Sequence, residues 1–238
     1  MCGRYALGVG EEDVRVHFSI DAVIDPGLVP SWNIAPSHGA AAVMERFEHP
    51  DAATPAGRGE RIRQLRCLTW GFVPHWAKTP GRAMINARAE TLPDKPSFRS
   101  AGLKRRCLVP ASGYYEWQDT PAGKQPWFLS AGEGDPLLAF AGIYEAWRGG
   151  PGEPWLRSVA IVTRSAPDAI GHIHDRCPLV VPTHLWTQWL DPNPLERSDL
   201  RRLIDAIPDP LLRPRPVSRE VGNVASNHPG LVESIEAR

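Results

Sequence analysis

The chain has 238 residues, of which 27 are basic and 27 acidic, so its formal net charge at pH 7 is zero. This balance excludes the strongly basic global charge of a protein that coats nucleic acid, and a nucleic-acid partner would need a local basic groove. No apolar run approaches the ~20 residues that span a bilayer, and no basic and apolar blocks of a signal peptide open the chain. We therefore expect a cytoplasmic protein without membrane contact.

Four cysteines stand at positions 2, 67, 107 and 177, with no Cys-x-x-Cys pair and no metal-like spacing. This pattern predicts no zinc site and, in a reducing compartment, no disulfide framework. We expect no metal and no cofactor. The 25 prolines and 21 glycines predict short elements joined by many loops.

The expected elements begin with a helix over 10–20, where Val14 and Phe18 lie one turn apart. Segment 49–60 is expected to be an exposed loop between two strands. Strand-like runs then follow at 61–70, 106–117, 125–131, 136–147 and 156–166. An amphipathic helix is predicted by the spacing of Leu200, Leu203, Ile204 and Ile207. Segment 213–224 is expected to add a last strand.

Strand-like runs outnumber helices, and the loops between them are short. This order favours an antiparallel-rich α+β fold over βαβ winding. Neither an internal repeat nor a linker divides the chain, so we expect one domain over residues 1–238.

The first stretch that could carry chemistry is Met-Cys-Gly-Arg at the start of the chain. Removal of Met1, which aminopeptidases perform when the second side chain is small, would leave Cys2 with an α-amine and a thiol on adjacent carbons. No other position offers that pair of nucleophiles. The alternative is that Cys2 is a small hydrophobe that happens to fall there.

The segment Met-Ile-Asn-Ala-Arg-Ala-Glu-Thr, residues 84–91, holds two polar groups with a period of two. In an extended chain Asn86 and Arg88 share a face. The amide could donate to and accept from a reacting group, and the guanidinium could bind a phosphate or carboxylate. The alternative is a polar strand end in which Arg88 pairs with Glu90.

Glu116 lies between Tyr115 and Trp117 after an apolar stretch. A carboxylate among aromatic rings is partly desolvated, which raises its pKa and suits it to proton transfer near neutrality. The alternative is a solvent-facing member of an aromatic strand. Glu145 stands in the same pattern, so local sequence does not choose between the two acids.

His174 lies between a helix-like turn and an apolar strand, with Asp175 and Arg176 beside it. Histidine is the side chain whose ordinary pKa suits acid–base work at neutral pH. The alternative is a surface loop with a local Asp–Arg ion pair of little energetic weight. His172 competes with His174 on the same grounds.

Trp76 stands in a loop-like segment with Lys78 and Arg82, a combination that suits base stacking and phosphate contact. The alternative is a loop residue folded back onto the core. A basic groove could draw on Arg4, Lys78, Arg82, Arg88, Arg99, Lys104, Arg105, Arg106 and Arg176. The run Leu-Lys-Arg-Arg at 103–106 equally fits an ordinary solvated helix end.

Seven motifs occur in order from residue 1 to 224: MCGRYAL, SWNIAPS, WGFVPHWAK, INARAET, CLVPASGYYEWQ, GHIHDRCPLV and VSREVGNV. Together they resemble the SOS-response-associated peptidase (SRAP) family, whose members shield abasic sites in single-stranded DNA. The resemblance implies a mixed α/β domain with a curved, mostly antiparallel, barrel-like β core and flanking short helices.

Carried over residue by residue, the resemblance makes Cys2 the nucleophile that bonds to the ring-opened aldehyde of an abasic site once Met1 is lost. Asn86 would position the terminus and the sugar, and Glu116 and His174 would handle protons. It thus selects Glu116 over Glu145 and His174 over His172. The residues implied to contact DNA are Arg4, Asn33, Pro36, Trp76, Arg88, Thr163 and Arg176.

The implied partner is single-stranded DNA with abasic sites, bound by a monomer that associates with the bacterial nucleoid on damaged DNA. Replication-fork proteins, abasic-site lyase activity and self-processing peptidase activity are further expectations. Position 177 is Cys where many members carry Met, which leaves a second thiol near His174.

Two other classes of function remain open on the sequence. Amidotransferases with an N-terminal nucleophile also begin Met-Cys-Gly and use the α-amine as base for the thiol, as a peptidase would. The chain carries no second, synthetase-like domain, which weighs against an amidotransferase. A DNA-binding or protein-binding module in which Cys2 is incidental is the other reading.

Overall fold

The structure is a computed structural model that describes residues 2–48, 59–81, 83–132 and 137–235. Most of the loop expected at 49–60, and Arg82 of the expected groove, lie outside the described residues. Strands take up 39% and helices 20%, which confirms the α+β class. Within the described ranges, no helix combines the length and apolar character needed to cross a bilayer.

The strands are β1 (Tyr5–Leu7), β2 (Ala22–Val23), β3 (Ser31–Ile34), β4 (Gly39–Phe47), β5 (Arg61–Trp70), β6 (Asn86–Arg88), β7 (Arg106–Ala111), β8 (Gly113–Thr120), β9 (Gly123–Ala131), β10 (Leu138–Trp147), β11 (Leu156–Ser165), β12 (Arg176–Pro178) and β13 (Leu212–Pro216). The α-helices are α1 (Glu11–His17), α2 (Arg99–Lys104), α3 (Asp168–Gly171), α4 (Trp186–Trp189) and α5 (Arg197–Asp205). Single 3-10 turns lie at Ala89–Thr91, Thr183–Leu185, Arg219–Gly222 and Pro229–Val232.

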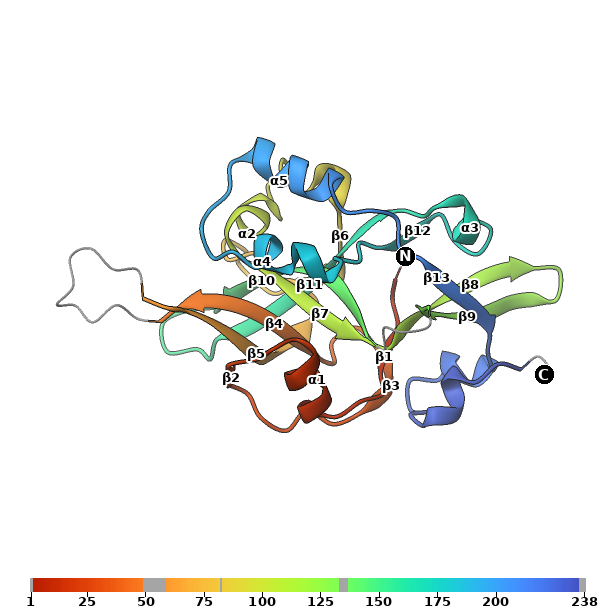
Figure 1. The fold of residues 1–238 in the computed structure, drawn as a ribbon. Coiled ribbons are helices and arrows are strands. Elements are labelled where there is room, and N and C mark those ends of the chain that lie inside the picture. Colours follow the sequence, from red (N-terminus) through yellow and green to blue (C-terminus); the bar gives the residue numbers. More distant parts are fainter. Residues whose placement is uncertain (1, 49–58, 82, 133–136, 236–238) are drawn as a thin grey trace.

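The larger sheet closes into a ring through its strand pairing, and Figure 1 shows its strands gathered beside the smaller sheet. Its order is β12-β11-β10-β7-β4-β5-β2, and β5 also pairs with β11 in parallel, at Thr69 with Ser158 and Trp70 with Val159. Strands β11, β10, β7, β4 and β5 therefore enclose a barrel. The other neighbours in the ring are antiparallel, so the curved, mostly antiparallel core is confirmed.

The smaller sheet has the order β13-β9-β8-β1-β3 and stands beside the barrel. Its strand β1 brings the start of the chain into the middle of the molecule, because Tyr5 pairs with Tyr114 of β8 and with Ile34 of β3. The Tyr5 ring packs against Trp70 of the barrel at a centroid distance of 5.3 Å. The N-terminal segment is thus held where the two sheets meet.

The expected strand 106–117 is two strands in different sheets, which corrects the prediction. The chain leaves the barrel after β7 and enters the smaller sheet as β8, and Ser112 at the crossing accepts a hydrogen bond from Gly8 N. Gly113 permits this crossing, because a Cβ there would lie 2.6 Å from the Leu129 carbonyl oxygen. Segment 213–224 is likewise only partly a strand: β13 ends at Pro216, and a 3-10 turn follows over Arg219–Gly222.

Two arginines of the run 103–106 are structural, which corrects their place in the expected groove. Arg106 is 3% exposed. Its guanidinium donates to backbone carbonyls of Gly102, Leu103, Trp189, Asp191 and Asn193. Arg105 is bound to the Glu145 carboxylate at 2.6 Å. The amphipathic helix expected near residues 200–207 is present as α5, which buries Leu200 and Leu203.

Candidate active site

Cys2 is fully buried, although it stands at the start of the chain. The Asn86 Nδ2 donates a hydrogen bond of 2.8 Å to the Cys2 carbonyl oxygen. Two residues further on, the Arg4 carbonyl accepts from Tyr115 N at 2.9 Å. These contacts lay residues 2–4 along β8 and hold Cys2 in a fixed place between β6 and β8.

The environment of Cys2 disfavours its thiolate. Burial raises the pKa of the Cys2 thiol well above its ordinary value, and the negative charge of Glu116 raises it further. A hydrogen bond from the Arg4 backbone opposes the shift without reversing it. Burial and Glu116 both favour the thiol over the thiolate, in contrast to the surroundings that activate the thiolate of a cysteine protease.

Asn86 is placed by the pairing of β6 with β11, which sets Asn86 beside Ile161 and Arg88 beside Thr163. The extended conformation confirms that Asn86 and Arg88 share a face. The Asn86 Oδ1 is buried and has no hydrogen-bond partner among the described residues. An unpaired buried acceptor is costly, so this oxygen is available to a donor that enters the site.

Glu116 is 4% exposed on β8, so it is not a solvent-facing strand residue. Strand alternation puts it on the same face as Tyr114 and opposite to Tyr115 and Trp117. Burial raises the pKa of the Glu116 carboxyl, and the charge of His174 opposes that shift. The carboxyl is thus electrostatically linked to both Cys2 and His174.

His174 lies in the turn after α3, with its Nδ1 2.9 Å from Asp175 Oδ1 and 3.0 Å from Arg176 N, which donates to it. The turn is tied to the β8–β9 hairpin: Gln118 Nε2 donates to the His172 carbonyl at 3.2 Å, and the His172 ring meets the edge of Trp127. His172 itself is exposed. The Asp–Arg ion pair of the alternative interpretation is not formed, because Arg176 pairs with Glu90.

The two acids that the sequence could not separate differ sharply in their surroundings. The Glu145 carboxylate lies 2.6 Å from Arg105 Nη2 and 3.1 Å from His75 Nδ1, and it accepts from Ala146 N. It therefore neutralises Arg105 and ties down the loop that carries His75. Glu116 faces Cys2 instead, and of the two it alone belongs to the candidate site.

This contrast predicts opposite effects on stability. Because the pKa of Glu116 is raised in the fold, its contribution to stability is greatest below the unfolded pKa and declines as pH rises through the folded pKa. Glu116→Gln should therefore unfold at higher urea than wild type at pH 8, with a smaller difference at pH 4.5. Glu145→Gln should lose roughly 1–3 kcal/mol at pH 8, because Arg105 is left without its carboxylate. A destabilised Glu116→Gln at pH 8 would contradict this assignment.

Arg4 and Asn33 form one cluster at the base of the smaller sheet. Arg4 Nη1 donates to Asn33 Oδ1 at 2.7 Å and to the Val221 carbonyl at 2.8 Å. Asn33 is 2% exposed, and its Nδ2 donates to the carbonyls of Asn223 and Ser226. Asn33 therefore orients Arg4 and holds the segment 221–226.

A groove of about 600 Å³ extends from the candidate site. It is lined by Asn86, Arg88, Thr91, Asp94, Lys95, Phe98 and Thr163. Arg88 is exposed, and among the described residues it has no ion-pair partner, so the alternative in which Arg88 pairs with Glu90 is wrong. Lys95 is a cation of this groove that the sequence analysis did not single out, because no motif marks it.

Arg176 and Trp76 differ in how open they are to a ligand. Arg176 donates to Glu90 at 2.7 and 3.0 Å and to the Thr163 carbonyl at 2.7 Å, so its charge is already balanced. Trp76 is 58% exposed in the loop after β5, which excludes the folded-back alternative. Pro36 is exposed in the turn after β3.

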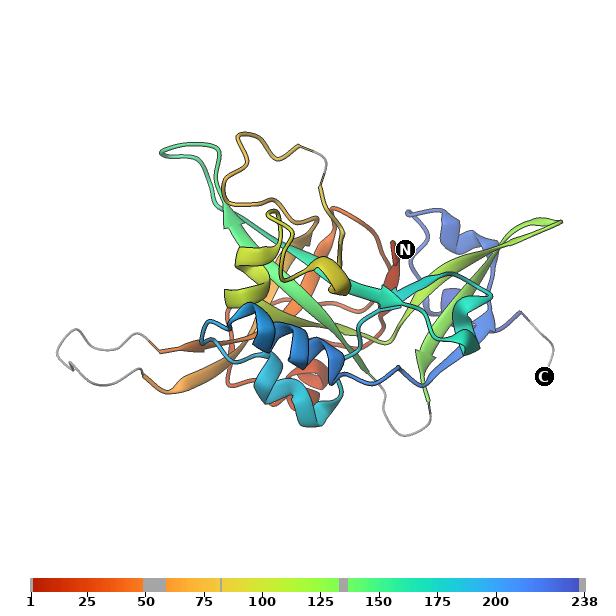
Figure 2. The ribbon, with the colours of Figure 1, turned by 90° about the horizontal axis from the view of Figure 1, so that it is seen from above.

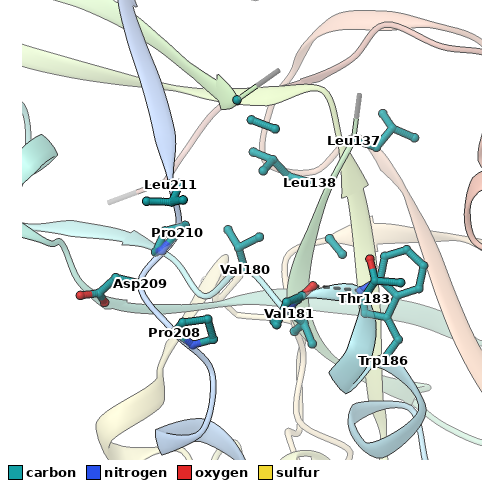
Figure 3. Close-up of a pocket in the computed structure, with 14 residues that line it drawn as sticks. Leu137, Leu138, Val180, Val181, Thr183, Trp186, Pro208, Asp209, Pro210 and Leu211 are labelled. Carbon is teal, nitrogen blue, oxygen red and sulfur yellow. Dashed lines mark hydrogen bonds between the residues drawn. The ribbon is translucent and has the colours of Figure 1, made fainter. Parts of the chain in front are cut away.

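Cys177 and a second cavity are not part of the candidate site. Cys177 is buried, and desolvation raises the pKa of its thiol to about 11. A cavity of about 580 Å³ contains none of the candidate residues. As Figure 3 shows, its wall is mainly apolar and includes Leu137, Leu138, Val180, Val181, Trp186, Pro208, Pro210 and Leu211. In the described ranges no group of three or more His, Cys, Asp or Glu could hold a metal ion.

The chain is similar in sequence to proteins named for abasic sites. It is 34% identical to the abasic site processing protein YoqW of Bacillus subtilis, over 98% of this chain and all of that one. It is 29% identical to the abasic site processing protein YedK of Escherichia coli, over 99% of this chain and all of that one. With HMCES of Xenopus tropicalis the identity is 27%, over 99% of this chain and 78% of that one.

Solved structures share the fold. A protein from Bacteroides thetaiotaomicron superposes with a TM-score of 0.79 at 19% identity, over 99% of this chain and all of that one. A phage-related protein from Bordetella bronchiseptica superposes with a TM-score of 0.64 at 30% identity, over 92% of this chain and 95% of that one. The family model of the SOS response associated peptidase (SRAP) matches residues 1–224. The chain therefore belongs to the SRAP family.

Proposed function

We propose that the protein processes abasic sites in single-stranded DNA by capturing the ring-opened aldehyde on Cys2, exposed as the N-terminal residue by loss of Met1. The observation that carries this proposal is the position of Cys2: it is buried next to the Asn86 amide and the Glu116 carboxyl, and that carboxyl interacts in turn with the His174 imidazole. The relatives named abasic site processing proteins supply the substrate class.

The proposed reaction uses both nucleophiles of an N-terminal cysteine. The α-amine adds to the aldehyde carbonyl, and loss of one water gives an imine. The thiol then adds across the C=N bond, its sulfur to carbon and its proton to nitrogen, and closes a five-membered thiazolidine. The α-amine has a reference pKa of ~7.7–8.0, so a useful neutral fraction exists at pH 7, whereas a lysine at ~10.4 is almost wholly protonated. Closure profits from the high effective molarity of a positioned group.

The surrounding groups fit distinct roles. The raised pKa of Glu116 suits a carboxyl that moves a proton between the amine and the carbinolamine. His174 would assist opening of the closed sugar to its aldehyde. Asn86 fixes the Cys2 carbonyl through Nδ2, and its open Oδ1 would accept from the amine or a sugar hydroxyl.

A cysteine protease with a preformed thiolate does not match this site. An N-terminal-nucleophile amidotransferase would instead take the thiol proton with its own α-amine, and the test below distinguishes it. Here burial and Glu116 hold the pKa of the Cys2 thiol high, which suits a thiol that reacts second, after the amine.

We propose that the DNA strand binds in the groove next to Asn86. Arg88 and Lys95 would meet its phosphates, Arg4 would add a further positive charge, and Trp76 would stack on a base. So few phosphate contacts are compatible with a net charge of zero. We also expect the affinity for single strands to depend only weakly on salt, since each neutralised phosphate adds about 0.7 to the log–log slope. We propose a monomer that meets such strands at replication forks in the bacterial cytoplasm.

The test is a denaturing gel of the protein incubated with a single strand carrying one abasic site, beside an undamaged strand. A shifted band only with the lesion, together with an intact mass that lacks Met1, supports the proposal. Absence of any adduct from protein that has lost Met1 overturns it. Turnover of glutamine or of peptide substrates would favour the amidotransferase or peptidase alternatives.

Replacing the proton-transfer groups should slow capture without abolishing strand binding. Glu116→Gln and His174→Gln are each expected to lower the capture rate by about 100-fold, in the range of general acid–base catalysis. Rapid-quench time courses on the abasic strand measure the rate, and an unchanged circular-dichroism spectrum verifies the fold. His172→Gln is the matched control and should leave the rate within about twofold. A loss of fold in either variant would make the residue structural instead.

A further inference from the structure

A cluster of arginines lies at one end of the barrel, away from Cys2. Arg46 of β4, Arg66 of β5 and Arg157 of β11 line one cavity of about 260 Å³. Tyr144 of β10 and Trp155, which precedes β11, also border it. We call these five residues the barrel mouth.

Strand alternation explains why the arginines converge. On each of the three strands, the residue two positions from the arginine lies on the same face and is buried and apolar. These residues are Met44 in β4, Leu68 in β5 and Val159 in β11. The other face of β4 and β5 is directed outward, since Glu45 there binds Arg61 and Arg63. The inward faces of β4, β5 and β11 therefore each bring one arginine to this cavity, and mouths of β-barrels are frequent ligand sites.

Within the described part of the chain, no carboxylate forms an ion pair with any of the three arginines. Arg46 donates to the Tyr144 hydroxyl at 3.4 Å, and Arg66 donates to Gln64 Oε1 at 3.0 Å. Glu145 borders the cavity, but its carboxylate is bound to Arg105 and His75.

The three positive charges of the barrel mouth repel one another. Burial lowers the pKa of Arg66, and the positive charges of Arg46 and Arg157 lower it further, against a smaller opposing effect of Asp25. An unbalanced, partly desolvated guanidinium cluster gains from an anion. Three planar forks suit the oxygens of a phosphate better than a single carboxylate.

The barrel mouth adjoins the loop that carries Trp76. His75 Nδ1 lies 3.1 Å from Glu145 Oε2, and Trp147 Nε1 donates to the Ala77 carbonyl at 2.7 Å, so this loop is fastened to the end of β10. Figure 2 shows the loop after β5 and the β10–β11 connection at the same edge of the molecule. The exposed Trp155 lies on that connection, with Arg148 4.8 Å above its ring.

We propose that the barrel mouth is a phosphate site that holds the backbone of the captured DNA strand beyond the lesion, with a base against Trp155. This inference rests on the proposed function, because it assigns a binding site to the part of the same DNA strand that lies away from the captured lesion. Along β11 the mouth lies six residues from Thr163 in the groove, about 20 Å in an extended strand. Only strands longer than the groove can therefore reach it.

The test compares two triple variants. Arg46→Gln/Arg66→Gln/Arg157→Gln removes the barrel mouth charges, and Arg15→Gln/Lys124→Gln/Arg202→Gln removes three exposed charges that sit in surface ion pairs elsewhere. Each is titrated with abasic single strands of about 5 and about 25 nucleotides over a range of salt. For the long strand, the barrel mouth variant should show a log–log salt slope lower by about 0.7, from the one phosphate that the three guanidiniums share. For the short strand, both variants should match wild type.

Equal slopes of both variants on the long strand, with normal melting curves, overturn the proposal. Undamaged strands separate this failure from that of the proposed function, because they report binding without capture. If undamaged strands distinguish the two variants but no adduct forms with the abasic strand, the proposed capture is wrong and the phosphate site at the barrel mouth is supported. Inorganic pyrophosphate tests the other source of phosphate: stabilisation of wild type by pyrophosphate, without any strand-length effect, assigns the mouth to a small phosphate compound and overturns the assignment to DNA.

Discussion

Cys2→Ala is expected to abolish the heat-stable adduct with an abasic strand while leaving noncovalent binding within about threefold. The variant keeps an N-terminal amine after loss of Met1, so it can still form an imine, but it has no thiol to close the ring. Imines hydrolyse, whereas a ring closed by a neighbouring thiol persists. The loss should exceed 100-fold in adduct yield, because nothing else in the site supplies a second nucleophile on the adjacent carbon.

Borohydride distinguishes the two halves of this mechanism. Reduction should trap Cys2→Ala on the abasic strand as a stable amine, which identifies the α-amine as the first nucleophile. Cys67→Ala is the matched control, since it removes an exposed thiol outside the site and should cross-link like wild type. A heat-stable adduct from unreduced Cys2→Ala would contradict the proposed chemistry and point to another nucleophile.

Arg106→Ala is expected to lower the free energy of unfolding by roughly 3–5 kcal/mol, the largest stability effect of any single change considered. Removing the guanidinium leaves the carbonyls of five residues without their donor, from Gly102 and Leu103 to the segment 189–193. Unsatisfied buried acceptors cost about 1–3 kcal/mol each when they cannot reach water. The truncated side chain also leaves a void beside Trp189.

Urea denaturation at pH 7 measures this effect. Arg202→Ala is the control, because Arg202 is exposed on α5 and its loss should change stability by less than about 0.5 kcal/mol. Arg106→Lys should recover only part of the loss, since an ammonium cannot match the planar fork. A change below about 1 kcal/mol in Arg106→Ala would contradict the structural role.

The strands that sequence predicted best are those rich in β-branched and aromatic residues, such as β5, β10 and β11. Strand β4 was implied by the loop expected between two strands at 49–60, but its bounds were not predicted, because Gly-Ala-Ala-Ala opens it and alanine favours helices over strands. Its conformation comes from pairing with β5 and β7, which lie later in the chain. Tertiary pairing thus overrode local propensity at that strand.

The candidate site shows a similar division. Period-two spacing was enough to place Asn86 and Arg88 on one face. It could not show that Glu90 pairs with Arg176, 86 positions away, which leaves Arg88 open to a ligand. Nor could it separate Glu116 from Glu145, because the difference lies in Arg105 and His75, which only the fold brings to Glu145. The DNA contacts remain predictions.

The position of Cys2 between the sheets has a consequence for synthesis on the ribosome. The candidate site draws on Asn86, Glu116 and His174, and a ribosome adding roughly 5–20 residues per second reaches the last of these some 10–30 s after Cys2. During that interval the terminus is open to aminopeptidase. The completed fold buries Cys2, so the aminopeptidase has its best access to Met1 during synthesis.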